Sequence, residues 1–131
     1  MLQFHGNESE SFCAAYRLPY IKALRVSSAE SIIKAESSYR SAQALLLDTY
    51  VPGVPGGTGE VFNWGWIAPP EQRNMPIILA GGLNAQNVAS ALKQVAPYAV
   101  DVSGGVELCK GKKDHKKIDE FVNEVNCVDH R

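Results

Sequence analysis

Residues 44–59 read ALLLDTYVPGVPGGTG, and this stretch decides the fold. Its first four residues are apolar, as in a strand that is buried on both faces of a parallel sheet. Asp48 ends the run and leads into a loop rich in glycine, which frees the backbone, and in proline, which fixes it. A carboxylate between a buried strand and such a loop stands where α/β enzymes place their chemistry. The stretch therefore predicts an α/β fold with a functional site near Asp48.

Strand and helix patterns alternate along the rest of the chain. Ser28 and Asn84 are good N-caps for two of the helices. Alternation of this kind predicts a parallel sheet with right-handed crossovers, and residues 1–131 read as a single domain. The expected strands cover residues 2–5, 20–26, 42–49, 76–80 and 98–102, and the expected helices cover 8–17, a segment after 28, 62–67, a segment after 84, and 114–125. The helix residues expected to be buried are Cys13, Ile32, Ile33, Val88, Ala91, Leu92, Val95, Ile118, Phe121, Val122 and Val125.

Charge and hydropathy exclude several classes of partner. The net charge is −1 and no basic stripe is present, so we expect no nucleic acid partner; the lysines between 110 and 117 read as a solvated helix start. No apolar stretch approaches the roughly 20 residues that span a bilayer, so we expect no membrane partner. Three cysteines without regular spacing argue against a disulfide framework and a zinc site. We therefore expect a reduced, cytoplasmic protein with no metal and no cofactor.

Four motifs occur in order along the chain: LQFHG at 2–6, LLDT at 46–49 with GGTG at 56–59, AGGLN at 80–84, and VDVSGGVE at 100–107. Together they resemble the motifs of phosphoribosylanthranilate isomerase, an enzyme of tryptophan biosynthesis, and the resemblance covers nearly the whole chain. It implies a parallel (β/α) barrel of TIM type, here a partial barrel of about five β/α units that corresponds to strands four to eight.

The resemblance also implies roles for individual polar residues. By this resemblance Asp48 is the general acid of an Amadori rearrangement, and burial at a strand end would support that role by favouring a protonated carboxyl group. The alternative is an aspartate that caps the following loop through local backbone hydrogen bonds. Asp101 is expected to contact ribose hydroxyls, unless it only bonds nearby backbone. His5 and Arg25 are assigned to substrate contacts, His5 with a structural alternative and Arg25 as a contact to an anion.

Two glycine-containing loops predict a phosphate site. Gly81 and Gly82 precede a helix, and Ser103 and Gly104 follow the last expected strand. Barrels often hold phosphate with the loops after strands seven and eight, where backbone N–H groups and a helix N-terminus converge on the anion. A single Gly-Gly pair usually marks only a turn. Gly104 replaces the second serine of the family motif, which leaves the backbone donors in place.

The length of the chain conflicts with a complete barrel. Such a barrel typically needs about 250 residues, so 131 residues imply a truncated product, a fragment or the tail of a longer polypeptide. The family's general base, a cysteine of its first strand, and its anthranilate-binding arginine have no counterpart here. Cys109 reads as an ordinary loop thiol. We therefore expect the isolated chain to be inactive.

Two other functions stay open beside the isomerase. One is a non-catalytic phosphate-binding half-barrel or assembly module that keeps only the two glycine loops. The other is a different ribose-phosphate-binding barrel, which the GGTG loop after LLDT disfavours. The expected partners are a sugar-phosphate substrate and either the missing N-terminal half or a second copy of the chain. Five strands cannot close an eight-stranded barrel, so unpaired edge strands would be available for association.

Overall fold

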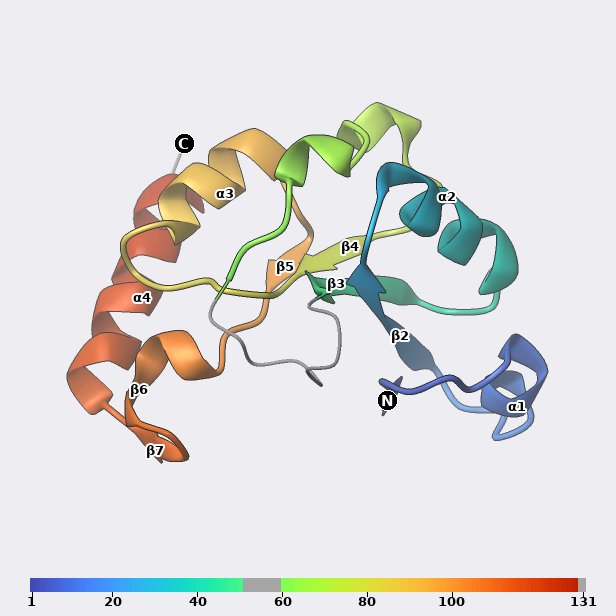
Figure 1. The fold of residues 1–131 in the computed structure, drawn as a ribbon, viewed down its shortest axis with the longest axis horizontal. Coiled ribbons are helices and arrows are strands. Elements are labelled where there is room, and N and C mark those ends of the chain that lie inside the picture. Colours follow the sequence, from blue (N-terminus) through green and yellow to red (C-terminus); the bar gives the residue numbers. More distant parts are fainter. Residues whose placement is uncertain (51–59, 130–131) are drawn as a thin grey trace.

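A five-stranded parallel sheet forms the centre of the computed structural model, which describes residues 1–50 and 60–129. Its strands follow each other in chain order: β1 (Leu2–Phe4), β2 (Tyr20–Val26), β3 (Ala44–Thr49), β4 (Ile77–Leu79) and β5 (Ala99–Val100). The helices are α1 (Glu10–Ala14), α2 (Ala29–Ser38), α3 (Val88–Val95) and α4 (His115–Asp129). Figure 1 shows α2, α3 and α4 along the outer side of the sheet and α1 at one end. This arrangement confirms the α/β fold and is consistent with a partial barrel.

The register of the strands separates a packed face from an inner face. Paired residues of neighbouring parallel strands point to the same side of a sheet. Lys22, Leu45 and Ile77 therefore share one face, and Leu45 and Ile77 there belong to a core that also contains side chains of α2, α3 and α4. Leu46 and Ile78 share the opposite, inner face. Complete burial of one such aliphatic side chain contributes about 1.5–3 kcal/mol, so the packed face holds the sheet and helices together.

Local signals explain where two of the helices lie. Ser28 caps α2 through a reciprocal pair of hydrogen bonds with Ser31, as its position in the sequence predicted. α3 buries the four residues that were expected to be buried, which are Val88, Ala91, Leu92 and Val95. Its N-cap is Asn87 instead of Asn84, because Asn84 caps the preceding turn with its own side-chain oxygen. The helix therefore begins one turn later than expected.

Several expected side chains are not buried. Ile33, Ile118 and Val122 are 63%, 37% and 47% exposed, because their helices offer a wider apolar stripe than the described neighbours cover. The last strand of the sheet is also shorter than expected and includes neither Tyr98 nor Val102. Cys13 is fully buried, as expected.

An antiparallel hairpin was not predicted. It consists of β6 (Glu107–Cys109) and β7 (Lys112–Lys113), and Gly111 turns the chain between them with a φ of +83°. The hairpin connects the loop after β5 to the start of α4. It therefore places Lys113 beside the loop of Ser103 and Gly104.

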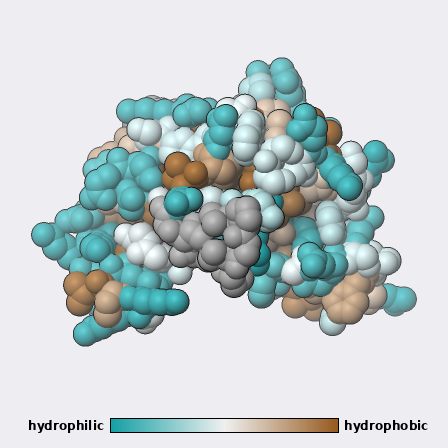
Figure 2. All heavy atoms as spheres, in the orientation of Figure 1, coloured by the Kyte–Doolittle hydropathy of each residue, from teal (hydrophilic) through white to brown (hydrophobic). Residues whose placement is uncertain are grey.

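The edges of the described sheet are β1 and β5. Next to β1, Phe12 of α1 is 50% exposed, and Tyr16 and Leu18, which follow the helix, are 53% and 54% exposed. The rings of Phe4, Phe12 and Tyr16 lie within 6.1 Å of one another, measured between centroids. Hydrophobic atoms gather over this end of the molecule in Figure 2. We call Phe4, Phe12, Tyr16 and Leu18 the aromatic patch.

Candidate functional site

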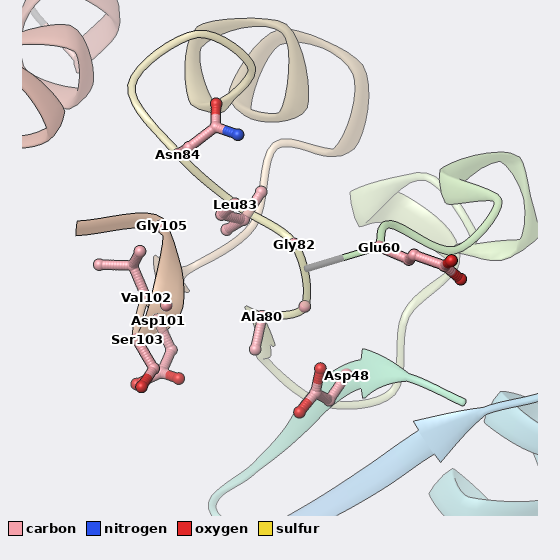
Figure 3. Close-up of a pocket in the computed structure, with 12 residues that line it drawn as sticks. Asp48, Glu60, Ala80, Gly82, Leu83, Asn84, Asp101, Val102, Ser103 and Gly105 are labelled. Atoms are coloured by element: carbon pink, nitrogen blue, oxygen red, sulfur yellow. The ribbon is translucent and has the colours of Figure 1, made fainter. Parts of the chain in front are cut away.

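A cavity of about 310 Å³ lies at the carboxyl ends of β3, β4 and β5. Figure 3 shows Asp48 on one side of it and Asp101 and Ser103 on the other. The loops 80–84 and 102–105 complete its wall, together with Glu60. The structure thus brings together six of the residues predicted from the sequence, which are Asp48, Gly81, Gly82, Asp101, Ser103 and Gly104.

Glycine is required where the loop after β4 passes the end of β3. Gly81 and Gly82 have φ angles of +86° and +65°, a region that side-chain-bearing residues rarely adopt. A Cβ atom on Gly81 would lie 2.5 Å from Thr49 Oγ1 and 2.7 Å from Asp48 Oδ1. The loop can therefore approach Asp48 only because this residue has no side chain.

The two glycine loops also touch each other. A Cβ atom on Gly105 would collide with the carbonyl oxygen of Leu83 and would lie 3.1 Å from the Cα of Asn84. By contrast, a Cβ atom on Gly104 would have no neighbour within 4 Å among the residues that the structure describes. Gly105 thus permits close approach of the loops, while Gly104 lies at the open cavity.

Asp48 has the features of both of its predicted roles. Its Oδ1 accepts a hydrogen bond from the backbone N–H of Thr49 at 2.7 Å, which is the local bond of the structural alternative. The carboxylate is also half-buried and lines the cavity, as the catalytic role requires. Thr49 in turn donates from Oγ1 to the carbonyl oxygen of Glu60 at 2.5 Å, which ties the end of β3 to residue 60. The local bond therefore orients Asp48 without removing it from the cavity.

A lysine that the sequence did not single out holds the second glycine loop. Lys113 Nζ donates to the carbonyl oxygen of Ser103 at 2.9 Å and lies 3.3 Å from Ser103 Oγ. The same ammonium group pairs with Glu107 Oε1 at 2.9 Å. This hydrogen bond from Lys113 is the main reason why the pKa of Glu107 is lowered. The sequence does contain a signal for this pair: Glu107 and Lys113 lie on either side of Gly111, at a spacing typical of a hairpin.

His5 and Arg25 do not lie in this cavity. They line a second one of about 500 Å³, at the carboxyl ends of β1 and β2, together with Tyr39 and Tyr50. Arg25 is nevertheless paired in register with Asp48, so the two residues are neighbours on the inner face of adjacent strands. The two cavities therefore flank the end of β3.

Four further expectations concern the rest of the chain. The GGTG loop falls outside the described residues. Cys109 lies exposed in β6. In the part of the chain that the structure describes, no three His, Cys, Asp or Glu side chains are grouped so that they could hold a metal ion. Among residues 1–50 and 60–129, no helix has the length and apolar character needed to cross a membrane.

Comparison with known proteins identifies close relatives. A family described as N-(5'-phosphoribosyl)anthranilate (PRA) isomerase matches residues 1–124. The N-(5'-phosphoribosyl)anthranilate isomerase of Pseudomonas syringae pv. tomato is 57% identical over 126 residues, which are 96% of this chain and 60% of that protein. The protein of the same name from Pseudomonas fluorescens strain SBW25 is 58% identical over 125 residues, 95% of this chain and 59% of that protein. This chain therefore spans about 60% of the length of these relatives.

Solved structures agree with the sequence relatives. Phosphoribosylanthranilate isomerase from Thermotoga maritima superposes with a TM-score of 0.82 at 41% identity, over 95% of this chain and 60% of that chain. A second structure of such an isomerase, in complex with reduced 1-(o-carboxyphenylamino)-1-deoxyribulose 5-phosphate, gives 0.77 at 38% identity, over 95% and 58%. A third, described as monomers generated from the dimeric Thermotoga maritima enzyme, gives 0.79 at 38% identity, over 95% and 59%.

Proposed function

The chain belongs to the N-(5'-phosphoribosyl)anthranilate isomerase family, and on this basis we propose that it carries the phosphate-binding and acid-donating part of that enzyme's site. One observation supports the proposal most strongly: the carboxylate of Asp48 lines the same cavity as both glycine loops. A sugar phosphate held by those loops would extend toward Asp48. The domain is, on this proposal, a partial barrel over residues 1–131 that works in the cytoplasm.

The reaction of the family converts an aminoaldose into an aminoketose. An acid protonates the furanose ring oxygen, and a base then removes the proton from C2′. In our proposal, Asp48 donates the first proton while Thr49 N–H keeps its Oδ1 in place. The carboxylate of Asp101 accepts hydrogen bonds from the ribose hydroxyls at the opposite wall of the cavity. His5 and Arg25 contact another part of the substrate.

The phosphate is assigned to the two loops. Backbone N–H groups of Gly81, Gly82, Ser103 and Gly104 can converge on an anion there, since all four residues line the cavity. Gly105 keeps the two loops in contact and Lys113 fixes Ser103. The chain therefore supplies a phosphate site from both loops.

The general base is the part that the described residues do not provide. Cys13 is buried against Tyr20 and Ala42, and burial raises the pKa of its thiol, so it stays protonated. Cys109 and Cys127 are exposed and do not line the cavity. A general acid or base raises the reaction rate about 10²–10⁴-fold. Because the described residues provide no base, we expect no turnover above background from the isolated chain.

A non-catalytic phosphate-binding half-barrel is the second candidate. It is favoured by the lining of the first cavity. Among the described residues, both phosphate loops and an acid line this cavity, but no thiol does. Such a module would bind phosphate equally well and would gain no activity from a complementing segment.

A complementation experiment separates the two candidates. The chain is co-expressed with the part of the Pseudomonas fluorescens relative that it does not match, and turnover of phosphoribosylanthranilate is measured. We expect activity to appear, and Asp48→Asn to abolish it while Asp114→Asn, outside the cavity, leaves it unchanged. If the complemented protein is folded but inactive, the isomerase proposal fails in favour of the phosphate-binding module. Full activity with Asn at position 48 would instead remove Asp48 from its role as the acid.

A further inference from the structure

The first glycine loop is held by Asn87, which is not among the described residues that line the cavity. Asn87 Nδ2 donates to the carbonyl oxygen of Gly82 at 2.9 Å, and Asn87 Oδ1 accepts from the backbone N–H of Asn84 at 2.9 Å. We propose that Asn87 is a positioning residue of the phosphate site, and that the N–H of Leu83, which it turns toward the cavity, is a further donor to the phosphate. This inference rests on the proposed function and adds one donor and the residue that orients it.

Both ends of the Asn87 amide are in use, and this fixes the orientation of the side chain. The Gly82 carbonyl needs a donor and the Asn84 N–H needs an acceptor, so exchanging the nitrogen and the oxygen of the amide would break both bonds. Asn84 returns the bond, because its Oδ1 accepts from the N–H of Asn87 at 3.1 Å. These three bonds tie the glycine loop to the turn that precedes α3.

The bond to Gly82 sets the direction of the next peptide group. No peptide bond among residues 1–50 and 60–129 is cis, and in a trans peptide the N–H points opposite to the C=O. Since the Gly82 carbonyl points to Asn87, the N–H of Leu83 points away from Asn87. Leu83 lines the cavity between Gly82 and Asn84 (Figure 3), and within the described residues its N–H has no acceptor. An unpaired N–H at the wall of a cavity is suited to bind an anion.

The peptide after Gly82 needs this support because glycine does not fix it. Gly82 has a φ of +65°, and glycine populates positive and negative φ about equally readily. If the peptide between Gly82 and Leu83 turned over, its carbonyl oxygen would face the cavity and repel a phosphate. The second loop has the same construction, since Lys113 holds the carbonyl of Ser103 and the next N–H belongs to Gly104. In both loops, a side chain from a later element keeps a carbonyl oxygen away from the anion.

The direction of the Leu83 N–H can be tested on the chain itself with inorganic phosphate. The ¹⁵N-labelled chain is titrated, and the amide signals of the loop are followed. We expect the signal of Leu83 to shift with the same affinity as those of Gly81 and Gly82, and its proton to move to higher frequency. If Gly81 and Gly82 shift but Leu83 does not, this inference is wrong and the proposed function stands. If a folded sample shows no shift in either loop, the proposed phosphate site fails and the inference fails with it.

The variant Asn87→Asp separates positioning from helix stability. The new carboxylate still accepts from the N–H of Asn84 and suits the start of a helix, but it cannot donate to the Gly82 carbonyl and repels it. We expect unchanged or higher thermal stability, together with loss of the Leu83 shift. Phosphate affinity should fall about ten- to hundredfold, the factor for one hydrogen bond to a charged group.

The variant Gln86→Glu is the matched control for charge. Gln86 is exposed in the same turn, and this change adds one negative charge without altering the bond to Gly82. Because exposed charges are screened, its phosphate affinity should fall less than about threefold. If a folded Asn87→Asp variant loses no more affinity than Gln86→Glu, the positioning role of Asn87 is wrong. A loss of stability in Asn87→Asp that accounts for the whole loss of affinity would also overturn it, because Asn87 would then serve only the helix.

Discussion

The ammonium group of Lys113 lies 2.9 Å from the carbonyl oxygen of Ser103, so the hairpin after the sheet is bonded directly to a loop of the proposed phosphate site. The loop is exposed, and within residues 1–50 and 60–129 no close neighbour fixes Gly104 from the cavity side. Glu107 holds the other side of the same ammonium group at 2.9 Å. The order of the loop therefore depends on a bond from outside the cavity.

Replacing Lys113 should weaken phosphate binding. We expect Lys113→Met to reduce the affinity for inorganic phosphate about two- to tenfold, because one hydrogen bond contributes about 0.5–1.5 kcal/mol. Lys112→Met is the matched control, since it removes the same charge from the neighbouring exposed position of β7. Calorimetry or the amide shifts of Ser103 and Gly104 can measure the difference. Equal losses in both variants would show that only net charge matters.

The ion pair of the hairpin should respond to acid. The pKa of Glu107 is lowered, first of all by its hydrogen bond from Lys113. A carboxylate with a depressed pKa in the folded state contributes stability above its unfolded pKa and loses it as the pH falls through the folded pKa. Urea unfolding between about pH 7 and pH 3 should therefore show a weaker pH dependence for Glu107→Gln than for the wild type. Parallel curves for the two proteins would contradict this assignment.

Adjacent glycines in the second loop should differ in their tolerance of a methyl group. Gly105→Ala forces a Cβ atom against the carbonyl oxygen of Leu83, so the two loops must separate. We expect a loss of about 1–3 kcal/mol in the free energy of unfolding, as for other overpacked sites, together with loss of phosphate binding. Gly104→Ala meets open space and should change stability by less than about 0.5 kcal/mol. Thermal unfolding of both variants, with and without phosphate, makes the comparison.

The sequence predicts the residues of the first cavity because the chemistry there follows strand order. Asp48, Gly81 and Asp101 come at or just after the ends of three successive parallel strands, and such ends meet at one edge of a sheet. The bounds of β2 also match the expected residues 20–26, since the strand ends at Val26, just before two serines. These features depend on local pattern and on topology alone.

Other features depend on packing that a one-dimensional pattern does not contain. Lys113 looks like its neighbouring lysines in the sequence, and only the hairpin turn at Gly111 directs it to Ser103. Ile33 follows the same helical period as a core residue, yet it lies 63% exposed. His5 and Arg25 were expected to contact the substrate, but they line the second cavity and not the one that contains Asp101. They lie at the ends of β1 and β2, and a strand end contributes only to the space next to it.

A partly buried ion pair near the second cavity should be important for stability. The Lys22 side chain is 5% exposed and binds Glu8 and the carbonyl oxygen of Gly6, with its Nζ 5.3 Å from the centre of the Tyr39 ring. Lys22→Met removes the partner of both acceptors, and since the Glu8 side chain is still 26% exposed, we expect a cost of about 1–3 kcal/mol. Lys34→Met, on the exposed side of α2, should be neutral. Urea titration measures both, and a loss for Lys22→Met no larger than for Lys34→Met would contradict the assigned role.

Self-association is the final expectation. β1 and β5 are the edges of the described sheet, and unpaired strand edges recruit further strands. The aromatic patch lies beside β1 and adds apolar surface to that edge. We therefore expect dimers or larger assemblies in sedimentation at micromolar concentration.

Two variants connect this association to the patch. Phe12→Ser combined with Leu18→Ser removes two half-exposed side chains near β1, and it should shift the equilibrium toward the monomer at least about tenfold, equivalent to about 1.4 kcal/mol. Ile33→Ser removes a more exposed side chain from α2, away from the edge, and should leave the equilibrium unchanged. A compact monomer for the wild type would show that the edges are protected in solution. Equal effects of both variants would instead point to non-specific hydrophobic association, because the patch would then contribute no more than any other exposed apolar side chain.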